Sequence, residues 1–147
     1  MTARARVQIG ASGSLPRDAR LRARREFTRI QRHGLRTHTE AFTIIADASP
    51  DGRPRFGCAI SRKIGNAVVR NRVRRLLKEI FRRTAPDLPA IDLVFIAKPA
   101  AASRAESGLD ALAEDLLPGM MRAVDGLARR TEQRNAKKAR KDEGDGA

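Results

Sequence analysis

The sequence predicts a mixed α/β fold in which helices pack against a small sheet. Residues 67–83 repeat apolar side chains at helical spacing, while residues 40–47 and 56–60 alternate apolar residues as strands do. Residues 91–97 form a near-continuous apolar run, which suits an interior strand covered on both faces. Because strand, helix and strand follow one another, strands 56–60 and 91–97 can form a parallel pair.

The composition describes a basic chain of single-domain length. Its 147 residues include 31 Lys or Arg against 17 Asp or Glu, a formal charge of +14 that is typical of nucleic-acid binders. Arginine outnumbers lysine, and its planar guanidinium matches phosphate and stacks on bases. Five Phe, with no Tyr or Trp, limit any mechanism that stacks several bases on a sheet. The excess of arginine therefore favours structured RNA or DNA over a membrane surface as the partner.

Cysteine use and the lengths of the apolar runs bear on the cellular compartment. Cys58 stands alone, which excludes an intramolecular disulfide and a multi-cysteine zinc site. No segment reaches the roughly 18 apolar residues that span a bilayer, and none resembles the core of a signal peptide. A cytoplasmic protein is the simplest expectation.

Residues 1–19 are expected to form a basic flexible arm, with an organelle transit peptide as the minority alternative. Residues 20–33 then place Phe27 and Ile30 at helical spacing and end at Gly34, a common residue after a helix. The polar side of this short helix bears a second set of basic residues: Arg24, Arg25, Arg29 and Arg32.

Strands 40–47 and 56–60 are separated by the sequence SPDGRP. Proline, aspartate and glycine are usual turn residues, so the two strands are expected to form a hairpin. Cys58 alternates with the apolar residues of the second strand. It is expected to be a small core residue rather than a nucleophile, because no histidine lies near it in the sequence.

The helix at 67–83 has both a start signal and a two-sided pattern. Asn66 is a good N-cap, so the helix is expected to begin at Ala67. The core-facing stripe is Val69, Val73, Leu76, Leu77 and Ile80. Between Ser61 and Arg83 there are nine Lys or Arg and one acid, Glu79, so ion pairing within the helix can neutralise little of the charge. A merely solvated face normally mixes signs, and a polyanion is the favoured partner.

Downstream of strand 91–97, residues 107–121 return to helical spacing with Leu109, Leu112, Leu116 and Met120. Pro118 lies inside this helix and is expected to kink it or split it at Leu117. Residues 128–147 are polar and basic and are expected to be a disordered tail, which leaves 20–127 as the folded domain.

No catalytic constellation is found in the sequence. Glu79 and Asp87 stand alone near the basic helix, Asp92 sits within an apolar strand, and the two histidines lack the companions that a metal site needs. No catalytic residue and no metal ligand are therefore expected in this chain. The open alternatives are a structural RNA- or DNA-binding protein of the ribosomal-protein kind and, less favoured, a protein-only nuclease.

The segment RFGCAISRKIGNAVVRNRVRRLLKEIF closely resembles the signature of the bacterial ribonuclease P protein component. The resemblance extends over about residues 20–125 and implies a two-layer α/β sandwich of order αββαβα, with a left-handed crossover around the basic helix. It also implies the protein subunit of a ribonucleoprotein endonuclease that removes the 5′ leader from precursor tRNA. The catalytic groups and magnesium ions would belong to the RNA subunit. The expected partners are the catalytic RNA and precursor tRNA, with no obligate protein partner and no membrane.

The resemblance also assigns residues to two RNA contacts. The motif Arg70, Asn71 and Arg72 would hold RNA, with a basic surround of Arg62, Lys63, Asn66, Arg74, Arg75 and Lys78. Phe27 and Phe42 match positions near a cleft for the leader. Gln31 and Ile45 stand in the same cleft where relatives often have Phe and Tyr, so stacking on the leader is expected to be weaker or replaced by arginine contacts.

Overall fold

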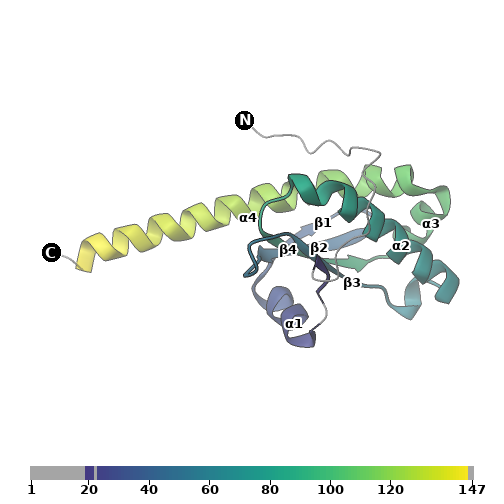
Figure 1. The fold of residues 1–147 in the computed structure, drawn as a ribbon, viewed down its shortest axis with the longest axis horizontal. Coiled ribbons are helices and arrows are strands. Elements are labelled where there is room, and N and C mark those ends of the chain that lie inside the picture. The colour runs from purple at the N-terminus through teal and green to yellow at the C-terminus, as the bar shows by residue number, and fades with distance from the viewer. Residues whose placement is uncertain (1–18, 22, 146–147) are drawn as a thin grey trace.

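The computed structural model describes residues 19–21 and 23–145 (Figure 1). Its helices are α1 (Arg24–His33), α2 (Ala67–Thr84), α3 (Ala100–Ser107) and α4 (Leu109–Asp145). Its strands are β1 (Leu35–His38), β2 (Phe42–Ala48), β3 (Arg55–Ala59) and β4 (Ile91–Ala97), and the 3-10 turns η2 (Arg62–Ile64) and η3 (Ala85–Asp87) flank α2. Every predicted helix and strand is present, and β1 and α3 are additions. The predicted arm, residues 1–19, lies outside the described residues apart from Ala19.

The four strands form one mixed sheet in the order β1-β2-β4-β3. β2 is antiparallel to both β1 and β4, whereas β3 is parallel to β4, so the predicted parallel pair is confirmed. The predicted hairpin between residues 40–47 and 56–60 is wrong, because β4 lies between these strands. β4 is buried on both faces and takes an interior position, where both its edges are paired. The handedness of the crossover through α2 stays a prediction.

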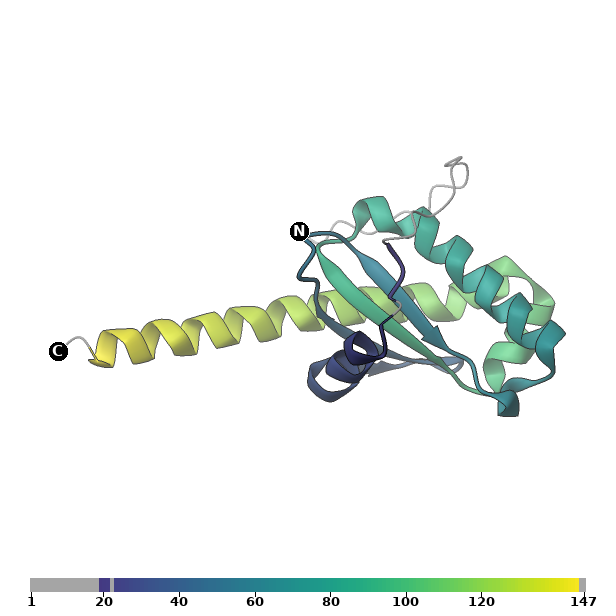
Figure 2. The ribbon, with the colours of Figure 1, turned by 60° about the horizontal axis from the view of Figure 1, so that its bottom comes forward.

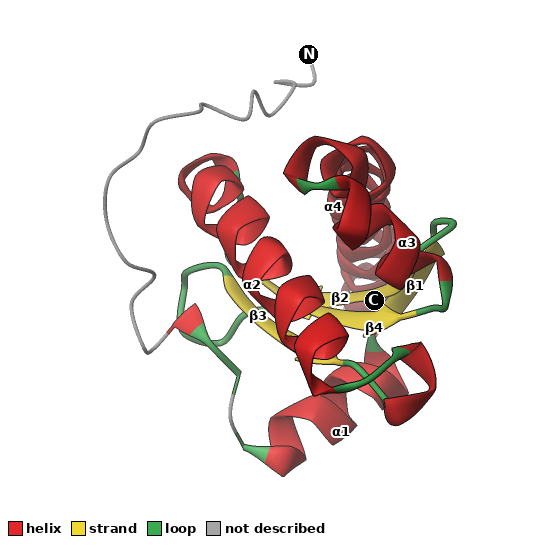
Figure 3. Cartoon of the chain, turned by 90° about the vertical axis from the view of Figure 1, so that its right-hand side faces the viewer, coloured by secondary structure: helices red, strands yellow, loops and turns green. Residues whose placement is uncertain are grey.

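Helices cover both faces of the sheet, with α2, α3 and α4 on one face and α1 on the other (Figure 3). The main core lies under α2–α4. There, Phe42 packs edge-on against Phe95 with ring centroids 6.3 Å apart, and Phe56 stacks on Phe81 at 4.6 Å. The stripe predicted on α2 is confirmed: Val73, Leu77 and Ile80 are buried, while Val69 and Leu76 are half-buried at its margins.

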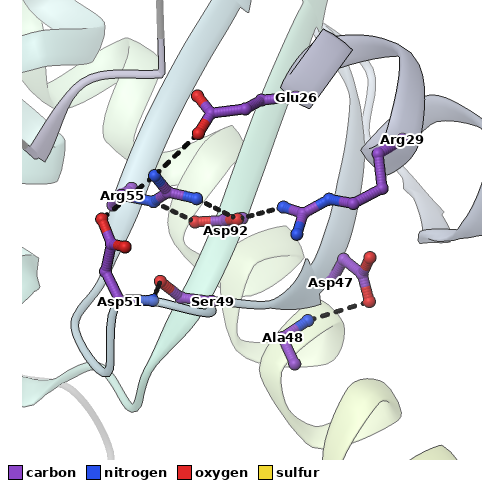
Figure 4. A network of polar contacts seen from close by, with 8 residues as sticks. All are labelled: Glu26, Arg29, Asp47, Ala48, Ser49, Asp51, Arg55 and Asp92. Atoms are coloured by element: carbon purple, nitrogen blue, oxygen red, sulfur yellow. Dashed lines mark hydrogen bonds and ion pairs between the residues drawn. The ribbon is translucent and has the colours of Figure 1, made fainter. Parts of the chain in front are cut away.

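A buried ion-pair network fastens α1 to the opposite face (Figure 4). Asp92 of β4 is fully buried and receives two hydrogen bonds of 2.9 Å from Arg55 of β3, one from Nε and one from Nη2. Arg29 of α1 donates to the same carboxylate at 2.6 Å, and Glu26 of α1 accepts from Arg55 at 3.0 Å. These contacts join α1, β3 and β4 beside a small apolar cluster of Leu21, Ile30, Ile45 and Val94.

The first half of α4 packs on the main core and on the β1–β2 turn. Leu112, Leu116 and Met120 are buried, as their spacing predicts. The Asp115 carboxylate accepts hydrogen bonds from the Thr39 hydroxyl at 2.7 Å and from two backbone N–H groups of the turn. α4 and the β1–β2 turn approach each other closely at Gly119, where an added Cβ would lie 2.2 Å from the Thr39 methyl group. These contacts hold α4 against the β1 side of the sheet.

The structure departs from two expectations about α4. The helix continues through Pro118 without a break, so of the two predicted outcomes the split at Leu117 is wrong and the kink stays a prediction. Packing of the turns on either side against the sheet compensates for the missing N–H of proline. Helix also continues through Asp145, where a disordered tail was predicted for 128–147. No described helix is long and apolar enough to cross a membrane.

Candidate nucleic-acid interface

The start of α2 orients the cationic face. Asn66 is the N-cap, as predicted, and its side-chain Oδ1 accepts a hydrogen bond from the backbone N–H of Val69 at 3.0 Å. Gly65 precedes it, and a Cβ there would come within 2.9 Å of the Val69 side chain. The cap and the close turn fix where α2 begins, and therefore which residues face the core and which face away.

The outward face of α2 is strongly positive. Asn71, Arg74 and Arg75 are exposed, and Arg70, Arg72 and Lys78 are half-buried. Asn71 Oδ1 accepts a hydrogen bond from Arg74 Nη1 at 2.8 Å, which orients that guanidinium. We call the group Arg70, Asn71, Arg72, Arg74, Arg75 and Lys78 the α2 surface.

The single acid of α2 is occupied at the far end of the helix. Glu79 pairs with Arg82, and it accepts from Arg83 Nε at 2.9 Å. Hydrogen bonds from Arg82, and then from Arg83, lower the pKa of Glu79 below its ordinary value. Among the described residues, the five cations of the α2 surface make no ion pair with a carboxylate. Their charge is therefore available to an external anion.

A cavity of about 770 Å³ opens beside this surface, between α2, β3 and the segment that leads into α1. Its α2 wall is Asn71, Arg72, Arg74, Arg75 and Lys78, and its apolar lining includes Leu21, Phe27, Phe56, Gly57, Cys58 and Val68. The Phe27 ring lies over Gly57, where a Cβ would come within 2.5 Å of it. Val68 stands at the rim and is 66% exposed. We call this cavity the β3 pocket.

The β3 pocket combines two features that nucleotides require. Its cationic wall can bind phosphate, and Phe27 offers a half-buried aromatic ring to a base. Burial raises the pKa of the Cys58 thiol, and the nearby Arg74 opposes this shift without cancelling it. The neutral form of the thiol is therefore favoured, and Cys58 contributes apolar lining to the pocket. Across the described residues, no group of three His, Cys, Asp or Glu side chains could share a metal ion. The cationic wall and the aromatic ring thus suit the pocket to binding RNA.

The sequence model of the family described as ribonuclease P matches residues 15–120. The chain belongs to the ribonuclease P protein family. The ribonuclease P protein component of Desulfovibrio desulfuricans is 44% identical over 127 residues, which cover 77% of this chain and 95% of that relative. The component of Brevibacillus brevis is 37% identical over 110 residues, covering 73% of this chain and 84% of the relative.

Solved structures agree with this assignment. The ribonuclease P protein of Thermotoga maritima is 30% identical, with a TM-score of 0.64 over 70% of this chain and 96% of that protein. The protein of Staphylococcus aureus is 26% identical, with a TM-score of 0.61 over 67% of this chain and 92% of that protein. The chain is therefore a protein subunit of ribonuclease P, a tRNA-processing enzyme. A structural RNA-binding protein without a role in cleavage is not favoured.

The ribonuclease P motif residues occupy different places around the β3 pocket. Asn71 and Arg72 line it, whereas Arg70 is outside its lining. Arg62 and Lys63 are exposed on η2, just before α2, and the Oδ1 of Asn66 is engaged in the helix cap. The predicted RNA-binding residues thus form a broader surface than the pocket itself.

The predicted leader cleft needs correction. Phe27 lines the β3 pocket, but Phe42 is fully buried in the main core on the other face of the sheet, against Phe95. Ile45 is also fully buried, in the cluster beneath α1. Gln31 is exposed on α1 outside the pocket lining. Neither Phe42 nor Ile45 can reach a ligand without rearrangement of the core, so their assignment to the cleft is wrong in this structure.

Several pocket residues were missed in the sequence. Leu21, Phe56, Gly57 and Val68 line the pocket, although none was assigned to a site. Val68 could have been identified from the sequence, because it is a large apolar residue outside the buried stripe of an amphipathic helix. Gly57 carried a weaker signal, because a glycine inside a strand often marks a close approach by another group.

Proposed function

We propose that the α2 surface binds the catalytic RNA of ribonuclease P and that the β3 pocket receives part of the 5′ leader of precursor tRNA. The observation that supports this most strongly is the set of α2 cations that have no carboxylate partner in the described part of the chain, beside a pocket with an aromatic ring in its lining. Phosphates would pair with Arg72, Arg74 and Arg75, and a leader base would stack on Phe27.

In this proposal the chain assists catalysis without contacting the scissile bond. The catalytic RNA and its substrate are both polyanions, and a cationic protein between them lowers their mutual repulsion and raises substrate affinity. The described residues do not gather a carboxylate cluster that would hold magnesium. We therefore assign the magnesium ions and the hydrolytic chemistry to the RNA, and we place the protein in the cytoplasm with both RNAs.

The decisive experiment compares two matched double variants. Arg74→Ala with Arg75→Ala removes charge from the α2 surface, whereas Arg82→Ala with Arg83→Ala removes equal charge from the end of the same helix, where Glu79 is the partner. Binding to a cognate catalytic RNA is measured over a salt titration. We expect the first variant to lose roughly tenfold to hundredfold in affinity, and the slope of log K against log salt to become shallower by about 1.5. Equal behaviour of the two variants would contradict the assignment.

A cleavage assay tests the division of labour. Protein, catalytic RNA and both together are incubated with precursor tRNA at low magnesium. We expect no cleavage by protein alone and clear stimulation of the RNA by the protein. Cleavage by the protein alone would indicate a protein nuclease, and a lack of stimulation would indicate a purely structural RNA-binding role.

A further inference from the structure

The distal part of α4 is not required by the fold. Residues 131–142 continue the helix away from the body, and all their side chains are exposed (Figure 1 and Figure 2). The ribonuclease P sequence match ends at residue 120, before this segment begins. Neither core packing nor the shared family fold explains why these residues form a helix.

Four cations of α4 lie along one face of the helix. Arg130, Arg134, Lys137 and Lys141 are spaced four, three and four residues apart. At about 100° per residue these four cations lie within roughly 60° of one another, along about 17 Å of helix. By the same geometry Glu132 falls on the opposite side, and Asp142 lies on the flank of these cations, about 110° from their centre. We call Arg134, Lys137 and Lys141 the α4 stripe.

Arg130, one helical turn before the α4 stripe, is anchored to the body of the protein. Arg130 donates a hydrogen bond to the backbone oxygen of His33 at the end of α1, and Arg122 donates to the backbone oxygen of His38 in β1 at 3.1 Å. These contacts hold α4 along β1, which is the sheet edge opposite β3 (Figure 3). The α4 stripe therefore leaves the body from the side of the sheet remote from the β3 pocket.

The described residues do not compensate the charge of the stripe. Among the side chains that the structure describes, no ion pair involves its three members. Lys137 and Lys141 are also like charges four residues apart, which destabilises an isolated helix. A helix that is polar all round has little reason to be stable by itself. Ala136 and Ala139 are the only apolar residues from 131 to 142, so the segment lacks the apolar face of a membrane-surface helix. A polyanion is the partner that fits.

We propose that the α4 stripe binds the sugar-phosphate backbone of an RNA segment separate from the segment held by the α2 surface. This inference rests on the proposed function, because it takes RNA as the ligand of the protein. Contacts would be to phosphates and independent of sequence, since the stripe contains only Arg and Lys at 4.5 to 6 Å steps along the axis, given about 1.5 Å per residue. Bound phosphates would also relieve the repulsion within the helix.

The test uses full-length protein and two triple variants with the same change in charge. Arg134→Gln, Lys137→Gln and Lys141→Gln remove the stripe. The control is Arg129→Gln, Lys138→Gln and Arg140→Gln, whose residues are also exposed on the same helix but lie to the sides of the stripe. Affinity for a cognate catalytic RNA and for precursor tRNA is measured separately over a salt titration, and the thermal midpoint of each variant is recorded.

We expect the stripe variant to lose roughly tenfold in affinity for at least one of the two RNAs, with a salt slope shallower by about 2 to 3, and the control to lose clearly less. Equal losses in both variants would mean only long-range attraction and would overturn the proposal. Unchanged affinity for both RNAs would also overturn it and would direct attention to an acidic protein surface. Thermal midpoints should not change, because these side chains lie outside the core.

The α2 double variant in the same titration separates this inference from the proposed function. A loss for the Arg74→Ala and Arg75→Ala variant without a loss for the stripe variant would leave the proposed function standing and refute the inference. A loss for the stripe variant alone would support the α4 contact and contradict the role of the α2 surface.

Discussion

Arginines on the two faces of the sheet have opposite surroundings. On the α1 face, Arg55 is 5% exposed, and its guanidinium is shared among Asp92, Glu26 and Asp51. The hydrogen bonds from Arg55 to Asp92 raise the pKa of Arg55 further above its already high ordinary value. On the α2 surface, Arg74 and Arg75 are exposed, and the described residues offer them no carboxylate.

Arginine therefore serves both folding and binding in this protein, depending on whether the side chain is buried or exposed. A buried charge is tolerated only when it is paired and hydrogen-bonded, so Arg55 and Arg29, which pair with buried Asp92, are structural. An exposed cluster of like charge contributes little to folding and remains available to phosphates. Stability should therefore depend on the α1-face network, and RNA affinity on the α2 surface.

The largest effect is expected at the centre of the buried network. Asp92→Asn removes the charge shared by Arg29 and Arg55, and we expect it to lower the free energy of unfolding by about 3 kcal/mol, because the guanidinium groups lose their buried counter-ion. Asp47→Asn, at the paired position of β2, is the matched control, and its half-exposed carboxylate accepts from the N–H of Ala48. Urea unfolding followed by circular dichroism measures both. Similar losses would show that the network is not special.

A smaller effect is expected at the edge of the network. Arg29→Met removes one donor to Asp92 but leaves both hydrogen bonds from Arg55, and the Arg29 side chain is 35% exposed. We expect a loss of about 1 kcal/mol in the same urea experiment, below the usual range for a hydrogen bond to a charged group, because water screens this site. A loss as large as that of Asp92→Asn would mean that Arg29, rather than Arg55, is the principal counter-ion.

The sequence predicted α2 well because its signals are local. The Asn66 cap and the stripe through Val73 and Leu77 lie within one short window, and the structure confirms both. Sheet order is decided by distant residues. The SPDGRP turn resembled that of a hairpin, yet β4, more than thirty residues further on, takes the place between β2 and β3.

The candidate site was predictable on α2 and poorly predictable on the sheet. Alternation along β2 separates Phe42 from Ile45, but helices cover both faces, so alternation alone cannot show whether either residue reaches a pocket. Both turn out to be buried. The sequence shows Asp92 as an acid in an apolar strand, but its partners Arg29 and Arg55 come from elements that only the fold brings together. Long-range pairing accounts for what was missed.

On the α2 surface, by contrast with the α1-face network, removal of charge should leave the free energy of unfolding almost unchanged. The Arg74→Ala and Arg75→Ala variant is expected to unfold within about 0.5 kcal/mol of the parent protein, because both side chains are exposed and neither has a carboxylate partner among the described residues. The measurement is urea unfolding on the samples used for RNA binding. A loss near that of Asp92→Asn would break the separation between folding and binding arginines.

The smallest effect is expected where α2 does compensate its charge. Hydrogen bonds from Arg82 and Arg83 lower the pKa of Glu79 in the folded protein, so this ion pair stabilises the fold above the ordinary glutamate pKa and is lost as the pH falls through the lowered value. We expect Glu79→Gln to cost at most about 0.5 kcal/mol at pH 7, because the side chain is 32% exposed, and less at pH 3. Urea unfolding of both proteins at the two pH values measures the difference. If the difference in free energy of unfolding between the two proteins does not shrink on acidification, Glu79 stabilises α2 by packing rather than by charge. The α2 arginines would then contribute nothing to the fold, even where an acid faces them.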